Sequence, residues 1–477
     1  MIEDEQLKKV FTKDSQRLFA KISGDANPIH LEELEAVKFG SKREVVHGAN
    51  LFLTGLNWLI SLNLNINTYN CIICDFKNTV AVDEEVIYRI ENQFEKSLNL
   101  NVYTDATLCC TMKFSKTNEN KPSSSGELLN SNIEENKNRE NKSPNNNSRT
   151  IILNGNIWDA NEEILRNQYT FIFDKYGKKF IKTILSMTYV VGMIVPGKRS
   201  LFLSFQLKLF NKDKSTFTYR ISKIESRIKL YEIEFEAGHA VGTIRALRRR
   251  KSIKQPNIEN VIKLTSGEEF KCANSLIIGG SRGIGELVAK IIAVKGGKTY
   301  ITYYRDEAGA NRVMNEINNI FPFSSQVKKL NVLDNDYGIV GDILKNIKHI
   351  YYFATPVINN KPNKVFDQKL FKNFIDHYFS SLFSLCLTCE KLNMGKIKIF
   401  YPSTIFLSEK NNHHYEYAAA KFVGEKTCEL INKHFTNVSA HAVRIPILIT
   451  DQVNSIFRHS SEKNLKPLIE IVKIMNN

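Results

Sequence analysis

The chain lacks an unbroken apolar run of the length that a membrane span requires. Residues 49–66 carry no charge, but Asn50, Asn57, Ser61 and Asn63 interrupt them. We therefore expect a buried helix there and no membrane span. No signal peptide follows the opening Met-Ile-Glu-Asp, so we expect a cytoplasmic protein.

Cysteine is also scarce, with eight residues among 477, which is typical of a protein from a reducing cytosol. The two Cys-x-x-Cys pairs, Cys71/Cys74 and Cys386/Cys389, lie on apolar runs without turn residues between the thiols. Small thiols on such runs are more typical of a packed core than of a zinc or redox site. We expect no metal site.

Acidic residues are too few to balance the basic ones. The chain has 66 Lys and Arg against 50 Asp and Glu, a net charge of +16, which favours an anionic partner. No zinc-finger, helix-turn-helix or aromatic-stacking motif accompanies this charge, so the sequence does not point to nucleic acid.

The chain is too long for one ordinary domain. Residues 118–149 are rich in Asn, Ser, Glu and Lys and almost lack aliphatic side chains, a composition that cannot bury enough apolar surface to fold. We predict a disordered linker over residues 116–149, a first domain over 1–115, a second over 150–256 and a third over 270–477.

The third domain opens with a strand, a glycine-rich turn and a helix. An apolar run at residues 275–278 precedes the turn, and a helix-like stretch at 286–294 follows it. Glycines in such a turn let backbone amides approach a pyrophosphate at the helix N-terminus. The residues that we expect to bind a cofactor here are Gly279, Ser281, Arg282, Gly283, Ile284 and Gly285.

Tyr417 and Lys421 lie four positions apart further along the chain, and this spacing places them on one helical face. The lysine ammonium can then lower the pKa of the phenol, which lets the tyrosine exchange a proton with a carbonyl or alcohol oxygen.

The glycine turn and the Tyr417/Lys421 pair, in this order, resemble the short-chain dehydrogenase/reductase family. The resemblance implies a Rossmann-like, doubly wound parallel sheet and a catalytic hydroxyl beside Tyr417. Ser403 is our first choice for that hydroxyl, and Thr404 would take the role after a shift of one residue. The resemblance also implies that Ala354 and Lys421 contact the cofactor. Where the family has a relay asparagine, this chain has Tyr378.

The cofactor is predicted from the tip of the second strand of this domain. Arg305 stands there, no acidic residue does, and Arg282 lies within the glycine turn. An acid at the tip would favour NAD, whereas an arginine accommodates a 2′-phosphate. We therefore predict NADP(H).

A second candidate site lies near the N-terminus, in the segment Ser-Gly-Asp-Ala-Asn-Pro-Ile-His at residues 23–30. Its composition is that of an ordered turn. Asp25 and His30 can meet on one water molecule across the turn, an arrangement that suits addition or removal of water next to a carbonyl. Gly48 begins the long uncharged stretch, whose N-terminal amides could stabilise a carbonyl oxygen that gains negative charge.

This segment, together with His47-Gly48, resembles the MaoC-like family of (R)-specific enoyl-thioester hydratases, which have a hot-dog fold. The resemblance implies catalytic roles for Asp25 and His30 and substrate or oxyanion contacts for Asn27, His47 and Gly48. Residues 196–201, Pro-Gly-Lys-Arg-Ser-Leu, resemble the second half of double hot-dog hydratases. We expect an α+β double hot-dog module whose second half is not catalytic.

Both resemblances together predict a bifunctional enzyme of acyl-thioester and fatty acid metabolism, acting on an acyl-CoA or acyl carrier protein thioester. The N-terminal site would be a hydratase (lyase) and the C-terminal site an NADP(H)-dependent 3-ketoacyl reductase. Two alternatives stay open: a reductase of another carbonyl, such as a sugar or polyketide, and a hot-dog pair that only binds acyl groups. The basic run at residues 245–251 is either a solvated face or a landing site for the anionic carrier. A homo-oligomer is compatible with the sequence.

Overall fold

The computed structural model describes residues 5–116, 151–249 and 254–476. Within these ranges it leaves out residues 40, 42, 65–68, 95, 106, 154–161, 211–216, 238, 266, 357, 359–365, 393–394, 409–413, 447, 449 and 451–460. Residues 117–149 of the predicted linker lie outside the described chain. The chain divides into two compact units, residues 1–250 and 251–477, and each forms its own sheet.

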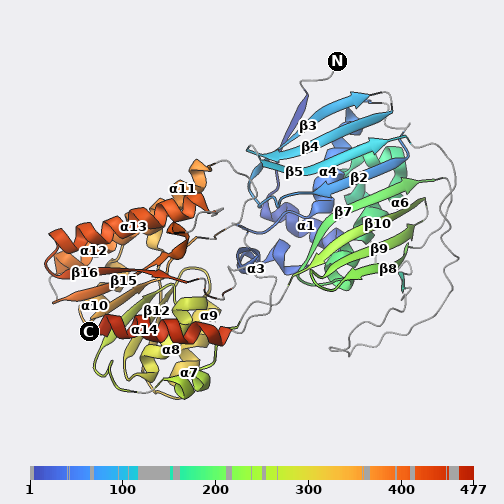
Figure 1. Ribbon diagram of the computed structural model, residues 1–477. Helices are drawn as coiled ribbons and strands as arrows, with labels where there is room; N and C mark the ends of the chain where they lie inside the picture. The colour runs from blue at the N-terminus through green and yellow to red at the C-terminus, as the bar shows by residue number, and fades with distance from the viewer. Residues whose placement is uncertain are drawn as a thin grey trace. The chain divides into compact units, whose positions relative to one another are not determined.

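The first unit contains a ten-stranded antiparallel sheet in the order β1-β3-β4-β5-β2-β7-β10-β9-β8-β6 (Figure 1). Its first five strands are β1 (Gln6–Val10), β2 (Cys71–Phe76), β3 (Glu85–Phe94), β4 (Ser97–Thr104) and β5 (Thr107–Ser115). The other five are β6 (Ile151–Leu153), β7 (Ser200–Leu209), β8 (Phe217–Glu225), β9 (Leu230–Ala237) and β10 (Ala240–Arg248).

The two halves of this sheet have the same order when read outward from the central β2–β7 pair. Each half begins with its outermost strand, continues through helices and ends with four strands. The helices of the first half are α1 (Lys13–Ser23), α2 (Pro28–Leu31), α3 (Glu33–Lys38) and α4 (Gly48–Ser61). Those of the second half are α5 (Glu162–Gln168), α6 (Thr170–Tyr189) and the π-helix η3 (Val190–Ile194). The unit is therefore a repeat of one strand–helix–four-strand pattern.

Helices α4 and α6 pack against each other, and the polar residues of the uncharged stretch join them. Tyr169 donates a 2.9 Å hydrogen bond to Asn50 Oδ1, and the backbone N–H of Ile172 donates one of 3.2 Å to Asn57 Oδ1. Asn50 and Asn57 thus interrupt the apolar run because they bind residues at the start of α6. A single apolar core extends through both halves.

The second unit contains a six-stranded sheet in the order β13-β12-β11-β14-β15-β16, and all its neighbouring strands are parallel. The strands are β11 (Asn274–Ile278), β12 (Lys298–Tyr303), β13 (Ser325–Lys329), β14 (His349–Tyr352), β15 (Ile397–Thr404) and β16 (Val438–Ile445). The α-helices are α7 (Ile258–Leu264), α8 (Gly283–Val294), α9 (Glu307–Asn318), α10 (Gly341–Leu344), α11 (Gln368–Ile375), α12 (Ser381–Leu392), α13 (Tyr415–His434) and α14 (Leu465–Asn476). A π-helix, η6 (Asp376–Ser380), and the 3-10 turns η4 (Val332–Asp334), η5 (Gly338–Val340), η7 (Ile405–Leu407) and η8 (Ser461–Asn464) complete it.

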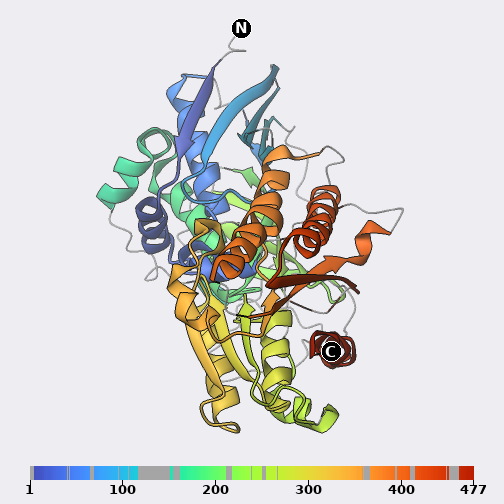
Figure 2. The same cartoon turned by 90° about the vertical axis from the view of Figure 1, so that its left-hand side faces the viewer.

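Helices cover both faces of this sheet. Alternate strand residues such as Ile277 and Phe400 pack with α8 and α14, whereas their neighbours such as Ile278 and Tyr401 pack with α12 and α13. The orange and red helices α11–α13 and the yellow-green helix α8 accordingly lie on opposite sides of the strands in Figure 2. A strand that is buried on both faces reads as a continuous apolar run. The predicted parallel, doubly wound sheet is confirmed.

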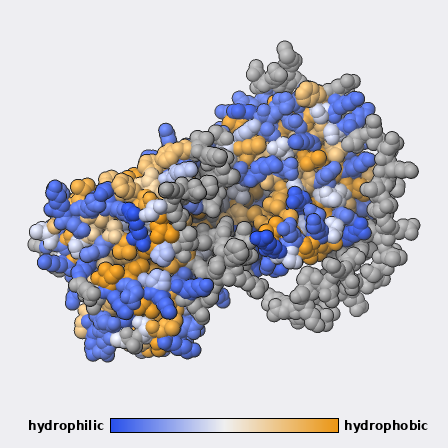
Figure 3. All heavy atoms as spheres, viewed as in Figure 1, coloured by the Kyte–Doolittle hydropathy of each residue, from blue (hydrophilic) through white to orange (hydrophobic). Residues whose placement is uncertain are grey.

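Hydrophilic residues cover much of each unit on the face that Figure 3 shows, with hydrophobic residues between them. Among the described residues, no helix combines the length and the apolar character needed to cross a membrane. The four cysteines of the two Cys-x-x-Cys pairs are buried, on β2 and α12.

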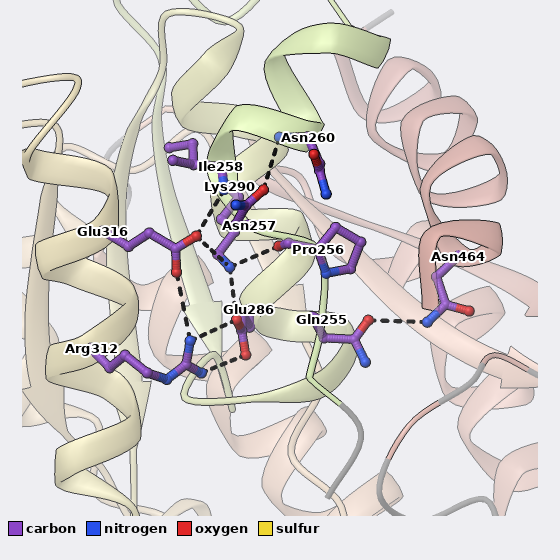
Figure 4. Close-up of polar contacts among 10 residues, drawn as sticks. All are labelled: Gln255, Pro256, Asn257, Ile258, Asn260, Glu286, Lys290, Arg312, Glu316 and Asn464. Carbon is purple, nitrogen blue, oxygen red and sulfur yellow. Dashed lines mark hydrogen bonds and ion pairs between the residues drawn. The ribbon is translucent and has the colours of Figure 1, made fainter. Parts of the chain in front are cut away.

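A partly buried network of ion pairs fixes helix α8, which follows the glycine turn (Figure 4). Lys290 Nζ lies 2.8 Å from a carboxylate oxygen of Glu286, 2.9 Å from one of Glu316 and 2.9 Å from the carbonyl oxygen of Pro256. Arg312, on α9, binds both oxygens of Glu286. Because Pro256 precedes β11 by 18 residues, this network ties the segment ahead of the sheet to the helix that carries the turn.

Candidate active sites

The loop between α1 and α2 carries Asp25, and local sequence explains its shape. Helix α1 ends at Ser23 and is capped by Gly24, whose φ of 67° lies in the left-handed region that glycine tolerates best. Asn27 then precedes α2, and Pro28 occupies the first helical turn, where its missing N–H costs little. His30 follows within α2, so Asp25 and His30 approach each other across a stiff connection.

The Asp25 carboxylate is buried, with the residue 3% exposed. Its Oδ1 accepts a 3.2 Å hydrogen bond from the backbone N–H of Asn27, and its Oδ2 accepts one of 2.6 Å from the hydroxyl of Thr188. A Cβ at Gly192 would overlap Oδ1, so the π-helix can pass the carboxylate only with glycine there. Burial raises the pKa of Asp25, although His30 and the hydrogen bonds work in the opposite direction.

His30 has one ring nitrogen committed to the protein. Nδ1 lies 2.7 Å from the carbonyl oxygen of Val45, and since a carbonyl only accepts, Nδ1 carries the proton. In the neutral ring Nε2 then has the lone pair. Burial lowers the pKa of His30, with the Asp25 charge opposing that effect. The neutral imidazole is thus favoured, in the tautomer that a base needs.

His47 supports this pair. Its ring stacks on that of His30 with 3.7 Å between centroids. Its Nδ1 lies 2.8 Å from Gln16 Oε1, and its Nε2 lies 3.0 Å from the carbonyl oxygen of Asp25. Ligand atoms of Asp25, His30 and His47 lie within 4.8 Å of one another. We assign no metal here, because the two nitrogens of His47 already face hydrogen-bond acceptors.

The second half of the sheet completes the site. The Asn27 side-chain amide donates to the carbonyl oxygen of Ser200 at 3.3 Å and to its hydroxyl at 3.2 Å. The backbone N–H of Arg199 donates to Asn27 Oδ1 at 3.3 Å. Thr188 and Gly192 were not predicted from the sequence as site residues. Ser200 was noted there only as part of the Pro-Gly-Lys-Arg-Ser-Leu segment at residues 196–201. Their separation of more than 160 residues from Asp25 leaves no local signal.

A pocket opens onto these residues. Asp25, Asn27, His30, Gly48, Thr188, Gly192 and Ser200 line it, together with the apolar side chains of Ile29, Val45, Val46, Leu51, Phe76, Val80, Val191, Leu201, Phe202 and Leu203. Gly48 is the first residue of α4. A Cβ there would lie 2.9 Å from the ring of Phe76, so glycine lets that ring close over the helix N-terminus. The pocket thus combines an acid–base pair, a helix N-terminus and an apolar wall.

In the second unit, the glycine turn lies between β11 and α8 as expected. Gly279 has a φ of 82°, and a Cβ there would meet the backbone of Phe353 and Ala354 at 3.0–3.1 Å. Ala354 therefore lies directly against the turn. A Cβ at Gly285 would overlap the carbonyl oxygen of Gly279. Ser281 and Arg282 lie in the turn itself, and Gly283 and Ile284 begin the helix, so the helix N-terminus can face a phosphate.

Two arginines accompany the turn. Among the described residues, Arg282 Nη1 is buried without a hydrogen-bond partner. A buried donor of this kind can bind an anionic ligand. Arg305 follows the tip of β12, with its guanidinium 5.1 Å from the ring centroid of Tyr304. The adjacent Asp306 caps α9 by accepting a 3.0 Å hydrogen bond from the N–H of Gly309. These features fit an anionic dinucleotide.

Tyr417 and Lys421 both lie on α13, one turn apart. Burial raises the pKa of Tyr417 to about 12, with a hydrogen bond from the Thr404 side chain acting in the opposite direction. Burial lowers the pKa of Lys421 to about 7. Lys421 Nζ donates a 2.6 Å hydrogen bond to the carbonyl oxygen of Pro402.

The two candidate hydroxyls at the end of β15 have different partners. Ser403 donates a 2.5 Å hydrogen bond to Glu425, and Arg444 binds both oxygens of that carboxylate at 2.8 and 2.9 Å. Thr404 Oγ1 accepts a 3.2 Å hydrogen bond from the backbone N–H of Phe406, and the Thr404 side chain acts to lower the pKa of Tyr417. Successive residues of a strand point in opposite directions. Ser403 and Thr404 therefore cannot both point toward the phenol of Tyr417.

Comparison with protein families gives one match for each unit. Residues 3–108 match the model of the MaoC-like domain. Residues 273–463 match the model of the short chain dehydrogenase domain. No curated protein matches the chain.

Solved structures resemble part of this chain at low identity. A short chain dehydrogenase from Shigella flexneri, solved with NADP, is 16% identical, with 44% of this chain and 91% of that chain covered and a TM-score of 0.38. An oxidoreductase from E. coli is 14% identical, with 46% and 93% covered and a TM-score of 0.39. The C-domain of a bacterial malonyl-CoA reductase, solved with NADP, is 20% identical, with 39% and 31% covered and a TM-score of 0.34.

Proposed function

We propose that this chain, which carries a MaoC-like domain and a short-chain dehydrogenase domain, is a bifunctional acyl-thioester enzyme. The first site would interconvert a trans-2-enoyl thioester and an (R)-3-hydroxyacyl thioester. The second would interconvert the 3-hydroxyacyl and 3-ketoacyl thioesters with NADP(H). The observation that carries the proposal is the buried Asp25 beside the half-buried His30 at a pocket with apolar walls.

Residues 1–115 and 150–256 would form the two halves of a double hot-dog module, and residues 270–477 the reductase. The repeated strand–helix–four-strand order supports this division. The second half has no equivalent of the Asp25–His30 motif in sequence. It would not be catalytic, yet it would hold Asp25 through Thr188 and Asn27 through Ser200.

In hydration, His30 and Asp25 would act as a base and an acid. Neutral His30 would take a proton from water through Nε2, and the water oxygen would bond to C3 of the enoyl group. The raised pKa of Asp25 favours the protonated carboxyl, which would deliver a proton to C2. The environments of Asp25 and His30 favour a protonated carboxyl and a neutral imidazole, so that one group can act as the acid and the other as the base. Dehydration would run through the same steps in reverse.

The thioester carbonyl gains negative charge when C3 is attacked. Gly48 lies at the N-terminus of α4, where free backbone N–H groups and the positive end of the helix dipole stabilise an anion. We assign the oxyanion contact to this terminus. His47 would position Asp25 and His30 through its stack and hydrogen bonds and would not contact the substrate.

In the second site, the glycine turn with Arg282, Arg305 and Ala354 would hold NADP(H), which supplies or accepts the hydride at C3. Tyr417 would exchange the proton of the C3 oxygen, and the Lys421 ammonium would lower the pKa of the phenol. Thr404 would hold the same oxygen, because it already interacts with Tyr417. Ser403 would instead fix β15 to α13 through Glu425.

The 3-hydroxyacyl thioester is the product of one reaction and the substrate of the other, which is the chemical reason to couple them. Incubation with crotonyl-thioester should give the 3-hydroxybutyryl product by hydration. Incubation with acetoacetyl-thioester and NADPH should give the same product by reduction. Asp25→Asn should block only the first reaction and Tyr417→Phe only the second. Unchanged hydration by Asp25→Asn would refute the assignment of the first site.

A further inference from the structure

The ammonium group of Lys421 lies among aromatic rings. Its Nζ is 3.9 Å from the ring centroid of Tyr378, 4.8 Å from that of Tyr401 and 5.8 Å from that of Tyr417. The residue is 5% exposed. The carbonyl oxygen of Pro402 accepts its hydrogen bond, so aromatic faces make up much of the remaining environment.

A buried ammonium is costly unless something in the protein replaces its lost hydration. The face of an aromatic ring attracts a cation within about 6 Å, and the attraction is stronger when water is excluded. Tyr378 is the nearest of the three rings, so it contributes most to holding this charge.

Tyr378 is itself firmly held. Its hydroxyl lies 2.5 Å from that of Thr355, just after β14. Its ring stacks on Phe374 with 5.7 Å between centroids and an interplanar angle of 11°. It is fully buried. The ring therefore presents a fixed face to the lysine.

We propose that Tyr378 is a positioning residue of the reductase site, whose ring, and not its hydroxyl, keeps Lys421 charged beside Tyr417. This inference rests on the proposed reductase function. Among the described residues, the groups near Lys421 include those of Tyr378 on η6, Tyr401 and Pro402 on β15, and Tyr417 and Cys428 on α13. Burial raises the pKa values of the three phenols and of the Cys428 thiol, so these groups are neutral at pH 7 and the rings act by their faces.

The expected pH effect has a definite sign. Reduction needs the charged lysine, so activity falls as the pH rises through the pKa of Lys421, which burial lowers to about 7. A ring that attracts the cation raises this pKa against that trend. Removal of the ring should therefore lower the pH at which kcat/KM falls.

The test compares Tyr378→Phe, which keeps the ring, with Tyr378→Leu, which removes it. We expect the high-pH limb of NADPH-dependent acetoacetyl-thioester reduction to move down by about one pH unit in Tyr378→Leu and to stay in place in Tyr378→Phe. Tyr337→Leu is the matched control, because Tyr337 is a buried tyrosine of the same core that bonds Ser381 instead. An unmoved limb in Tyr378→Leu, or the same shift in Tyr378→Phe, would overturn the proposal.

A second measurement does not depend on catalysis. At pH 6 Lys421 is charged in the folded protein and the ring stabilises it, whereas at pH 9 it is neutral. The difference in Tm between Tyr378→Phe and Tyr378→Leu should therefore be larger at pH 6 than at pH 9, and an equal difference would reject the role of the ring. If the wild type reduces no ketoacyl thioester, the proposed function fails while this comparison still tests the ring. Tyr378→Met replaces Tyr378→Leu if the latter does not fold.

Discussion

The hydroxyl of Thr188 donates a 2.6 Å hydrogen bond to the carboxylate of Asp25, across 163 residues of sequence. The donor lies in the second half of the ten-stranded unit and the acceptor in the first. The second half thus contributes to the environment of the Asp25 carboxylate in the first half.

Thr188→Val should change the pH dependence of hydration. The Thr188 hydrogen bond lowers the pKa of Asp25 while burial raises it, so its loss should raise that pKa further. If protonated Asp25 is the acid, the limb at which hydration falls with rising pH should move up by about one pH unit. Thr183→Val is the control, because Thr183 bonds only a carbonyl of its own helix in the described structure. A limb that does not move would contradict the assigned role of Asp25.

Gly192→Ala should disable hydration through a single methyl group. Its Cβ would overlap Asp25 Oδ1, so the carboxylate must move from its place beside His30. We expect a loss of about 100-fold or more in kcat/KM for crotonyl-thioester, with ketoacyl reduction unchanged. A Cβ at Gly341 meets nothing within 4 Å, and Gly341→Ala should therefore leave both activities intact. Near-normal hydration by Gly192→Ala would show that the Asp25 position is not critical.

Thr404→Val and Ser403→Ala separate the two hydroxyls at the end of β15. Thr404 interacts with Tyr417, so its loss should lower kcat for reduction by about 100-fold. Ser403 bonds Glu425, and its loss should mainly lower stability, by about 1 kcal/mol. Steady-state kinetics and thermal unfolding measure the two effects. A larger loss of kcat in Ser403→Ala would return the catalytic role to that serine.

Arg305→Ala should weaken NADPH binding and leave NADH binding nearly unchanged. Arg305 directly follows the tip of β12, and an arginine at this place accommodates a 2′-phosphate. Fluorescence titration should give a Kd for NADPH that is about tenfold higher in the variant, consistent with the loss of one charged hydrogen bond. Wild-type protein that binds NADH more tightly than NADPH would contradict the choice of cofactor.

The local geometry of each candidate site could be predicted from the sequence. Asp25 and His30 lie on one short segment whose turn is shaped by Gly24 and Pro28. Such a turn can be predicted from the residues of that segment alone. The glycine turn and the parallel sheet were likewise predictable, because apolar strands and glycine spacing mark them. The match of residues 3–108 and 273–463 to the two domain models confirms both family resemblances.

Other features depend on pairings that a single segment does not reveal. Thr188 and Gly192 reach Asp25 only because β2 pairs with β7 and α6 packs on α4. Whether Ser403 or Thr404 faces Tyr417 depends on one residue of register at the end of β15, and a slip of one residue reverses every side chain. The aromatic surroundings of Lys421 come from η6, β15 and α13 together.

The central claim is that one polypeptide processes one acyl chain at two sites. Acetoacetyl-thioester and NADPH should be incubated with the full chain, and the acyl-thioesters followed by mass spectrometry. We predict that 3-hydroxybutyryl-thioester appears first and crotonyl-thioester second, that Asp25→Asn stops the sequence at the hydroxyacyl product, and that Tyr417→Phe forms neither. Consumption of NADPH without any crotonyl-thioester in the wild type would contradict the claim.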